Sequence, residues 1–150
     1  MTATDSHSEA VHGAFAPESW TDAERRYGEL GSTAQVVVRS VTKAMAFDRE
    51  EYDRRVDGDV VETARQALFA ETLAVNVAGR ASFEAWREEY DREVHVAGSD
   101  SVGSVAWHVC SPAGTAVAAT FENEPEAAVG TVRRMAFNRL YRDRLAGGGP

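Results

Sequence analysis

Residues 104–121 read SVAWHVCSPAGTAVAATF, and this stretch decides the fold that we expect. Large apolar residues alternate with smaller or polar ones in its first half, at Val105, Trp107 and Val109, and this two-residue period is typical of a β-strand. Residues 112–114 read PAG, which is typical of a turn, and residues 115–121 predict a second strand. The stretch therefore predicts an antiparallel β-hairpin.

Two more strands and a helix are expected before this hairpin. Residues 73–77 and 94–96 both alternate apolar and polar side chains, which predicts short strands. Between them, Phe83, Trp86 and Tyr90 recur at helical spacing and predict one face of a short helix. The order strand, helix, strand therefore precedes the hairpin.

Capping residues and apolar stripes predict that the rest of the chain is helical. We expect helices over residues 20–30, 32–45, 48–56, 59–69 and 125–145. Gly31 is expected to end the first of these through a left-handed cap. In the second, Val38, Val41 and Met45 form the stripe that is expected to face the core.

These elements predict an α+β fold in a single domain. It consists of a helical N-terminal half, a roughly four-stranded mixed or antiparallel sheet and a C-terminal helix. We place the domain at residues 17–145, with a disordered head over residues 1–16 and a flexible tail over residues 146–150.

The composition points to an acidic protein adapted to high salt. The 150 residues carry a formal net charge of −8, which argues against a general polyanion binder. Lys43 is the only lysine beside 15 arginines, and the chain contains no isoleucine, a balance that fits a GC-rich halophile. The N-terminal residues resemble no secretory or transit signal, and no stretch is long and apolar enough for a membrane span. We therefore expect a cytoplasmic protein with no membrane partner.

Several sequence blocks resemble a small haloarchaeal family of unknown function. The blocks are AQVVVR at 34–39, GDVVETAR at 58–65, VAWH at 105–108 and AVAATF at 116–121. The resemblance covers about residues 14–145, and the blocks are mostly core-like. It implies no activity, ligand, cofactor or catalytic residue for this chain.

His108 and Cys110 form the strongest local cluster of reactive residue types. They share one face of the expected strand, and His95 from another strand would provide a third metal ligand if the register allows. The same pair could act as a thiol nucleophile and its base, with Asp100 or Glu93 orienting the imidazole. However, neighbours on one strand face lie about 6–7 Å apart, which is too far for a direct hydrogen bond. A half-buried histidine beside an inert cysteine is the simpler explanation of the pattern, so we assign no metal, cofactor or catalytic site.

The C-terminal helix supports nucleic-acid binding as an alternative function. Its arginines could contact phosphates, and Phe137 or Tyr141 could stack on bases. The arginines concerned are Arg133, Arg134, Arg139 and Arg142. Acids at the start of a helix and arginines toward its end are also what the helix dipole favours, so a solvated helix explains the same pattern.

The leading hypothesis is a non-catalytic domain that binds another protein or itself through an apolar face. The sequence contains no phosphate-binding, nucleophile-elbow, zinc-protease or calcium-loop motif. This favours a non-catalytic protein over an enzyme. Phe83, Trp86 and Tyr90 are the candidate interaction residues, because aromatic side chains bury much area with few rotamers. The same three residues would serve equally well as part of the core.

Overall fold

The computed structural model describes residues 9–99 and 101–146, and it confirms the α+β class. Its sheet has five strands in the order β1-β2-β4-β5-β3. The strands are β1 (Ala10–His12), β2 (Val75–Gly79), β3 (Glu93–Ala97), β4 (Ser104–Cys110) and β5 (Thr115–Phe121). The helices are α1 (Trp20–Ala44), α2 (Arg49–Arg55), α3 (Gly58–Thr72), α4 (Arg80–Glu89), α5 (Pro125–Ala136) and α6 (Arg142–Leu145). A 3-10 turn covers Ser111–Ala113, and a π-helical turn over Phe137–Tyr141 joins α5 to α6.

The expected hairpin is the centre of the sheet. β4 and β5 pair antiparallel from Ser104 opposite Phe121 to Cys110 opposite Thr115. The turn between them ends at Gly114, whose φ of 63° is the left-handed conformation that glycine adopts without strain. β2 pairs antiparallel with β4, and β3 pairs parallel with the outer side of β5. The sheet is therefore mixed.

The fifth strand comes from the segment that was expected to be a disordered head. β1 pairs antiparallel with β2, and Phe15 packs against the ring of Phe69. The alternation in β1 is too short to show in the sequence, because only three residues pair with the sheet. Residues 1–8 of the expected head and residues 147–150 of the expected tail lie outside the described residues.

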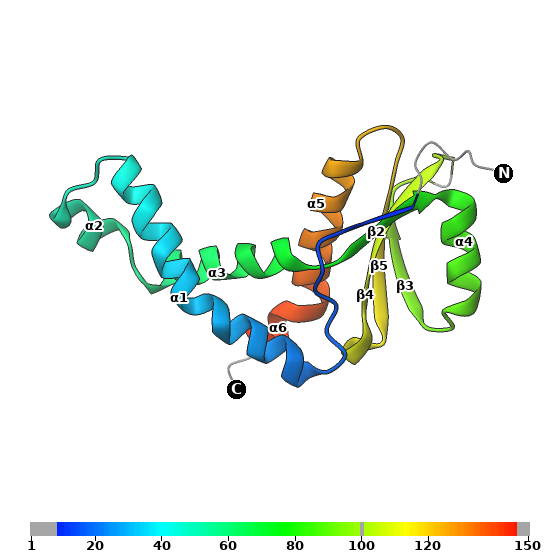
Figure 1. Cartoon of the computed structure of the whole chain (residues 1–150), viewed down its shortest axis with the longest axis horizontal. Helices are drawn as coiled ribbons and strands as arrows, with labels where there is room; N and C mark the ends of the chain where they lie inside the picture. The colour runs from blue at the N-terminus through cyan, green and yellow to red at the C-terminus, as the bar shows by residue number, and fades with distance from the viewer. Residues whose placement is uncertain (1–8, 100, 147–150) are drawn as a thin grey trace.

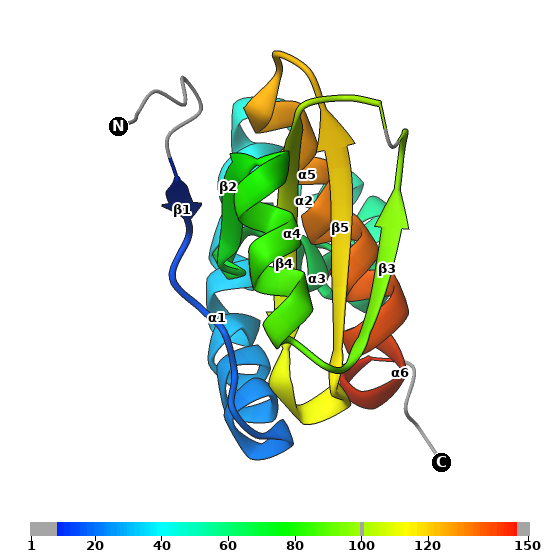
Figure 2. The same ribbon diagram turned by 90° about the vertical axis from the view of Figure 1, so that its right-hand side faces the viewer.

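Helices cover both faces of the sheet (Figure 1). α5 packs against β4 and β5 on one face. The C-terminal end of α3, with Phe69, also joins the main core on this face. α4 lies across the opposite face, with β1 and β3 at the two edges of the sheet (Figure 2). A second, smaller core forms there around Phe83, Val105 and Trp107. The two faces of β4 therefore pack into different cores, with Ala106 and Cys110 in the main core and Val105 and Trp107 in the smaller one.

The first three helices form an arm that extends away from the sheet (Figure 1). α1 and α3 pack against each other along the arm, and α2 lies at its far end. Tyr27 of α1 donates a hydrogen bond to Glu62 of α3 and packs edge-on against Phe69. Arg65 donates from Nε to the Tyr27 carbonyl oxygen at 2.8 Å. These contacts fix α1 on α3 next to the sheet.

The structure contradicts the expected break at Gly31, because residues 20–44 form one continuous helix. Gly31 lies inside this helix, opposite the Arg65 guanidinium, which a β-carbon there would meet at 3.6 Å. Gly28 has no atom within 4 Å of such a carbon. Neither glycine has a left-handed backbone, so neither one caps a helix. Gly31 instead allows close packing against Arg65, and Gly28 faces open space.

A buried polar pair ties the sheet to the C-terminal helices. His108 and Tyr141 are both fully buried, and His108 Nε2 lies 2.7 Å from the Tyr141 hydroxyl. His108 Nδ1 lies 2.7 Å from the carbonyl oxygen of Ala74. Because a carbonyl oxygen only accepts, Nδ1 carries the proton and Nε2 accepts from Tyr141. The neutral imidazole therefore satisfies both of its nitrogens inside the core.

Replacing Gly28 with alanine should stabilise the fold. Alanine loses less backbone entropy than glycine in a helix, and its methyl group meets no atom here, so the free energy of unfolding should rise by about 0.5–1 kcal/mol. Gly98→Ala is the matched control, because Gly98 has a φ of 110° and its β-carbon would collide with the Thr120 side chain. Urea unfolding should show opposite signs for the two variants, and a destabilising Gly28→Ala would contradict the helix assignment.

Acid should destabilise the protein through His108. Burial lowers the pKa of His108 from its ordinary 6.5 to about 4, with a smaller contribution from the charge of Arg133. The unfolded chain therefore takes up this proton at a higher pH than the folded chain. The stabilisation is complete above about pH 6.5 and is lost as the pH falls towards 4, by a total of about 3 kcal/mol.

This loss is measured by urea unfolding at several pH values between neutrality and pH 4. Carboxylates also titrate in this range, so the His95→Gln variant serves as the reference with His108 intact. It should keep the acid-dependent loss, whereas His108→Gln should flatten it. Equal slopes in the two variants would show that His108 does not carry the effect.

Candidate interaction site

The structure separates the three residues that were considered as metal ligands. His108 and Cys110 lie on the same face of β4 and are both fully buried. His95 lies on β3, and its register partner Val117 on β5 is also the partner of His108, so one strand separates the two histidines. His95 instead approaches Glu93 at 2.9 Å. Among residues 9–99 and 101–146, no group of three His, Cys, Asp or Glu side chains could hold a metal ion.

The thiol also lacks the environment of a nucleophile. Burial raises the pKa of Cys110, which keeps its thiol protonated. Both ring nitrogens of His108 are hydrogen-bonded, one to Ala74 and one to Tyr141, so neither nitrogen is available as a base for Cys110. Asp100, considered as the orienting acid, lies outside the described residues. The cluster therefore acts as a polar core, in which Tyr141 contacts both His108 and Cys110.

The arginines of the C-terminal helices do not form one uniform surface. Arg133 is largely buried, with its side chain 14% exposed, and its Nε donates to the Leu73 carbonyl oxygen at 3.1 Å. Arg134, Arg139 and Arg142 remain exposed. Arg142 lies over the ring of Phe137, which is itself buried. Three of the four candidate arginines thus remain accessible, and nucleic-acid binding by them stays a prediction.

The aromatic residues of α4 largely pack into the second core. Phe83 is 1% exposed, and its ring centroid lies 5.1 Å from that of Trp107. Trp86 stacks on Tyr90 at 4.8 Å and lies 5.3 Å from Trp107. Trp86 and Trp107 also line a surface cavity of about 430 Å³ beside β1. Phe83 thus faces the sheet, while Trp86 and Tyr90 remain only partly exposed.

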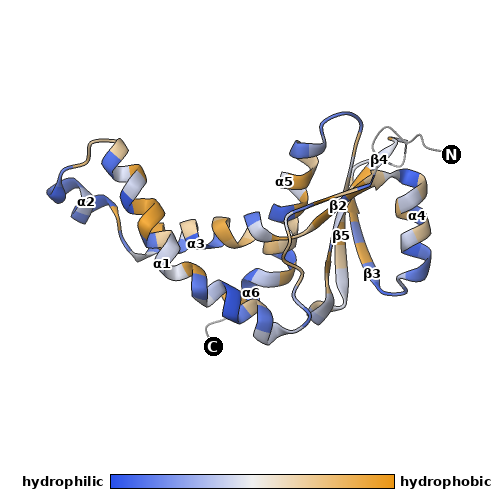
Figure 3. Ribbon diagram, in the orientation of Figure 1, coloured by the Kyte–Doolittle hydropathy of each residue, from blue (hydrophilic) through white to orange (hydrophobic). Residues whose placement is uncertain are grey.

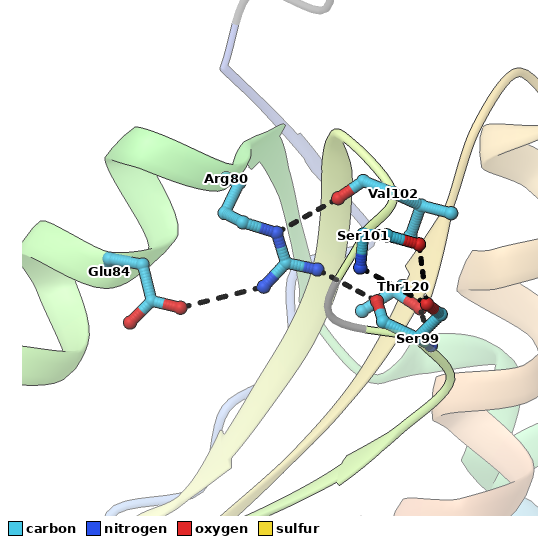
Figure 4. Close-up of polar contacts among 6 residues, drawn as sticks. All are labelled: Arg80, Glu84, Ser99, Ser101, Val102 and Thr120. Carbon is cyan, nitrogen blue, oxygen red and sulfur yellow. Dashed lines mark hydrogen bonds and ion pairs between the residues drawn. The ribbon is translucent and has the colours of Figure 1, made fainter.

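A second polar cluster fixes the loop between β3 and β4 (Figure 4). Arg80, the first residue of α4, donates to the carbonyl oxygens of Val102 and Ser99 at 2.9 and 3.0 Å. Its guanidinium also lies 3.5 Å from Glu84. The Ser99 backbone N–H donates to the Thr120 hydroxyl at 3.0 Å. Because these groups satisfy one another, the cluster explains the loop conformation and requires no ligand.

The exposed apolar surface of the arm was missed by the sequence analysis. Val36, Val37 and Val41 are 58%, 37% and 50% exposed, and Met45, which follows the last residue of α1, is 59% exposed. Figure 3 shows hydrophobic colour concentrated on this distal half of α1. We refer to Val36, Val37, Val41 and Met45 as the arm surface.

The arm surface corrects the stripe that was expected to face the core. Val38 is 7% exposed, but Val41 and Met45, which follow it on the same side of the helix, are 50% and 59% exposed. Consecutive helical residues are rotated by about 100°, so three valines in a row must leave apolar side chains on more than one face. The run at residues 36–38 therefore contained the signal for a second apolar face.

The position of α2 leaves the arm surface open. A surface cavity of about 420 Å³ is lined on its α1 side by Arg39, Thr42 and Lys43 and on its other side by α2 residues that include Tyr52. α2 thus approaches α1 from the side of Arg39 and Lys43.

Within the part of the chain that the structure describes, no helix combines the length and apolarity that crossing a membrane requires.

Comparison with known proteins gives a family without an assigned activity. The model of a family of unknown function, DUF5809, matches residues 14–142. No curated protein and no solved structure matches the chain. The match spans Phe15, the whole arm, the sheet from β2 to β5 and the helix α5. The chain therefore belongs to the DUF5809 family of unknown function.

Proposed function

We propose that this chain is a non-catalytic protein-interaction or self-association domain that makes contact through the arm surface. The observation that carries the proposal is the exposure of Val36, Val37 and Val41 on one helix. Valine is a weaker helix former than alanine or leucine, because its branched side chain loses rotamer freedom against the preceding turn. Exposed valines therefore contribute little to an isolated helix.

Contact with another protein would turn these valines into a source of stability. Removing a valine side chain from water contributes on the order of 1–2 kcal/mol. Met45 adds a flexible apolar side chain at the tip, and such side chains adapt to the shape of a partner. The composition favours a protein that works in concentrated salt, where exposed charges are screened over a few ångströms. Apolar contacts persist under these conditions.

The other candidate sites give weaker support to a function. The buried His108 and Cys110 are hydrogen-bonded and carry no accessible base or thiolate. Arg133 contacts Leu73 and Glu71 within the chain and is not free for phosphates. The aromatic residues of α4 are mostly used in the second core. The arm surface groups Val36, Val37, Val41 and Met45, whose side chains the described residues leave largely uncovered. We therefore place the interaction there, and we propose that the protein is cytoplasmic.

Two acidic substitutions on the arm surface should abolish association. Val37→Asp with Val41→Asp would place two carboxylates in the contact, so any complex should weaken at least about tenfold. The matched control is Ser32→Asp with Gln35→Asp, which adds the same charge to exposed positions of α1 outside the arm surface. Sedimentation at molar KCl should find the control associated and the Val37/Val41 variant monomeric, with unchanged circular dichroism.

The same preparation is examined for co-purifying macromolecules by mass spectrometry and absorbance. A stoichiometric protein, or a second copy, that is lost only in the Val37/Val41 variant supports the proposal. Association that survives these substitutions would overturn it, as would a wild-type chain that stays monomeric and alone. Nuclease-sensitive material that depends on Arg134 and Arg142 would instead favour nucleic-acid binding.

A further inference from the structure

We propose that the arm surface binds a second copy of this chain, with the two α1 helices antiparallel about a two-fold axis beside Val36. This inference rests on the proposed function and names its partner. It follows from the order of residues along the exposed side of α1, from the charges at the edge of that side, and from the shape of the molecule.

The exposed side of α1 carries an uncharged stripe that is three turns long. Its members are all exposed: Thr33, Val36, Val37, Ser40, Val41 and Ala44. Thr33, Val37, Ser40 and Ala44 are spaced by four, three and four residues, which is the spacing of a coiled-coil seam. The centre of the stripe is made of small side chains and one valine, so a second helix can approach closely.

An uncharged surface suits a copy of this particular chain. The net charge of −8 makes most surfaces of two copies repel each other. A two-fold axis places the same patch on both sides of the contact, so any charge at the centre would meet itself. The stripe avoids this conflict, because its members are uncharged and Arg39 and Lys43 lie at its edge, on the side of α1 that faces α2.

The edge of the stripe is complementary to itself in one register. Glu29, Val36 and Lys43 are spaced by seven residues and therefore lie along the same edge of α1. When two antiparallel helices place Val36 opposite Val36, Glu29 of each copy lies opposite Lys43 of the other. Glu29 and Lys43 are both exposed, and neither has an ion-pair partner among the described residues.

The shape of the molecule fits this antiparallel arrangement. The arm extends away from the sheet, so antiparallel arms would keep the two sheets at opposite ends of the pair (Figure 1). A parallel arrangement would place the two sheets side by side and would align Glu29 with Glu29. α1 already packs against α3 on its other side, so the pair would form a four-helix layer.

Zero-length cross-linking with a carbodiimide tests this register directly. Glu29 and Lys43 of one chain are 14 residues apart on a continuous helix, a separation of about 21 Å, so no direct bond can join them within one chain. We expect a covalent dimer in which peptide mass spectrometry finds an amide between Glu29 and Lys43. Lys43 is the only lysine, so its amide partners report the contact without ambiguity.

Charge exchange provides an independent measurement of the same contact. Lys43→Glu should weaken the dimer about tenfold at low salt, because two attractive pairs become repulsive. The double variant Glu29→Lys with Lys43→Glu should restore dimerisation, and Lys43→Arg should leave it intact. Sedimentation equilibrium measures all four proteins, and the difference between them should shrink in molar KCl.

The outcomes separate this inference from the proposed function. Suppose that a different protein binds in a way that requires Val37 and Val41, and that the chain itself forms no dimer. This result would overturn the inference and leave the proposed function standing. A dimer without the Glu29 to Lys43 amide and without rescue by charge exchange would also overturn it. A dimer that survives both valine substitutions would overturn the inference and the proposed function together.

Discussion

The ring of Phe69 holds the two parts of this protein together. It is fully buried, and four aromatic rings from three separate parts of the chain meet it edge-on: Phe15, Tyr27, Phe137 and Tyr141. Edge-to-face contacts of this kind add to the stabilisation from burial alone. Because Phe69 lies at the base of α3, it joins the arm to the sheet and to the C-terminal helices. The arm can extend into solvent only because this end is firmly held.

Much of the sheet could be predicted because its residues have one dominant period. The alternation around Trp107 and the turn at Gly114 define the hairpin locally, and local signals need no knowledge of distant contacts. Strand β1 could not be found in this way, since three residues carry too little pattern and its stability comes from pairing with β2. The interior Gly31 misled for a related reason: its close neighbour Arg65 lies on another helix.

The candidate sites were harder to predict, because each depends on which face of an element is covered. The sequence placed His108 and Cys110 on one face but could not show that Tyr141 satisfies them both. It found the aromatic residues of α4 but not that Trp107 buries Phe83. Val41 looked like core because it shares a helical stripe with Val38, which is buried, whereas Val41 itself is exposed. The apolar face that we propose for contact is one that the described residues leave uncovered.

The edges of the sheet set a limit on how large an assembly can become. β1 offers only three residues for pairing, and the other edge strand, β3, carries Glu93 and His95, whose side chains lie 2.9 Å apart. Short and charged edges resist the addition of further strands from other molecules. Growth by sheet extension is thereby blocked at both ends. The two-fold contact between arms proposed above would close on itself after two chains, giving a finite particle rather than a fibre.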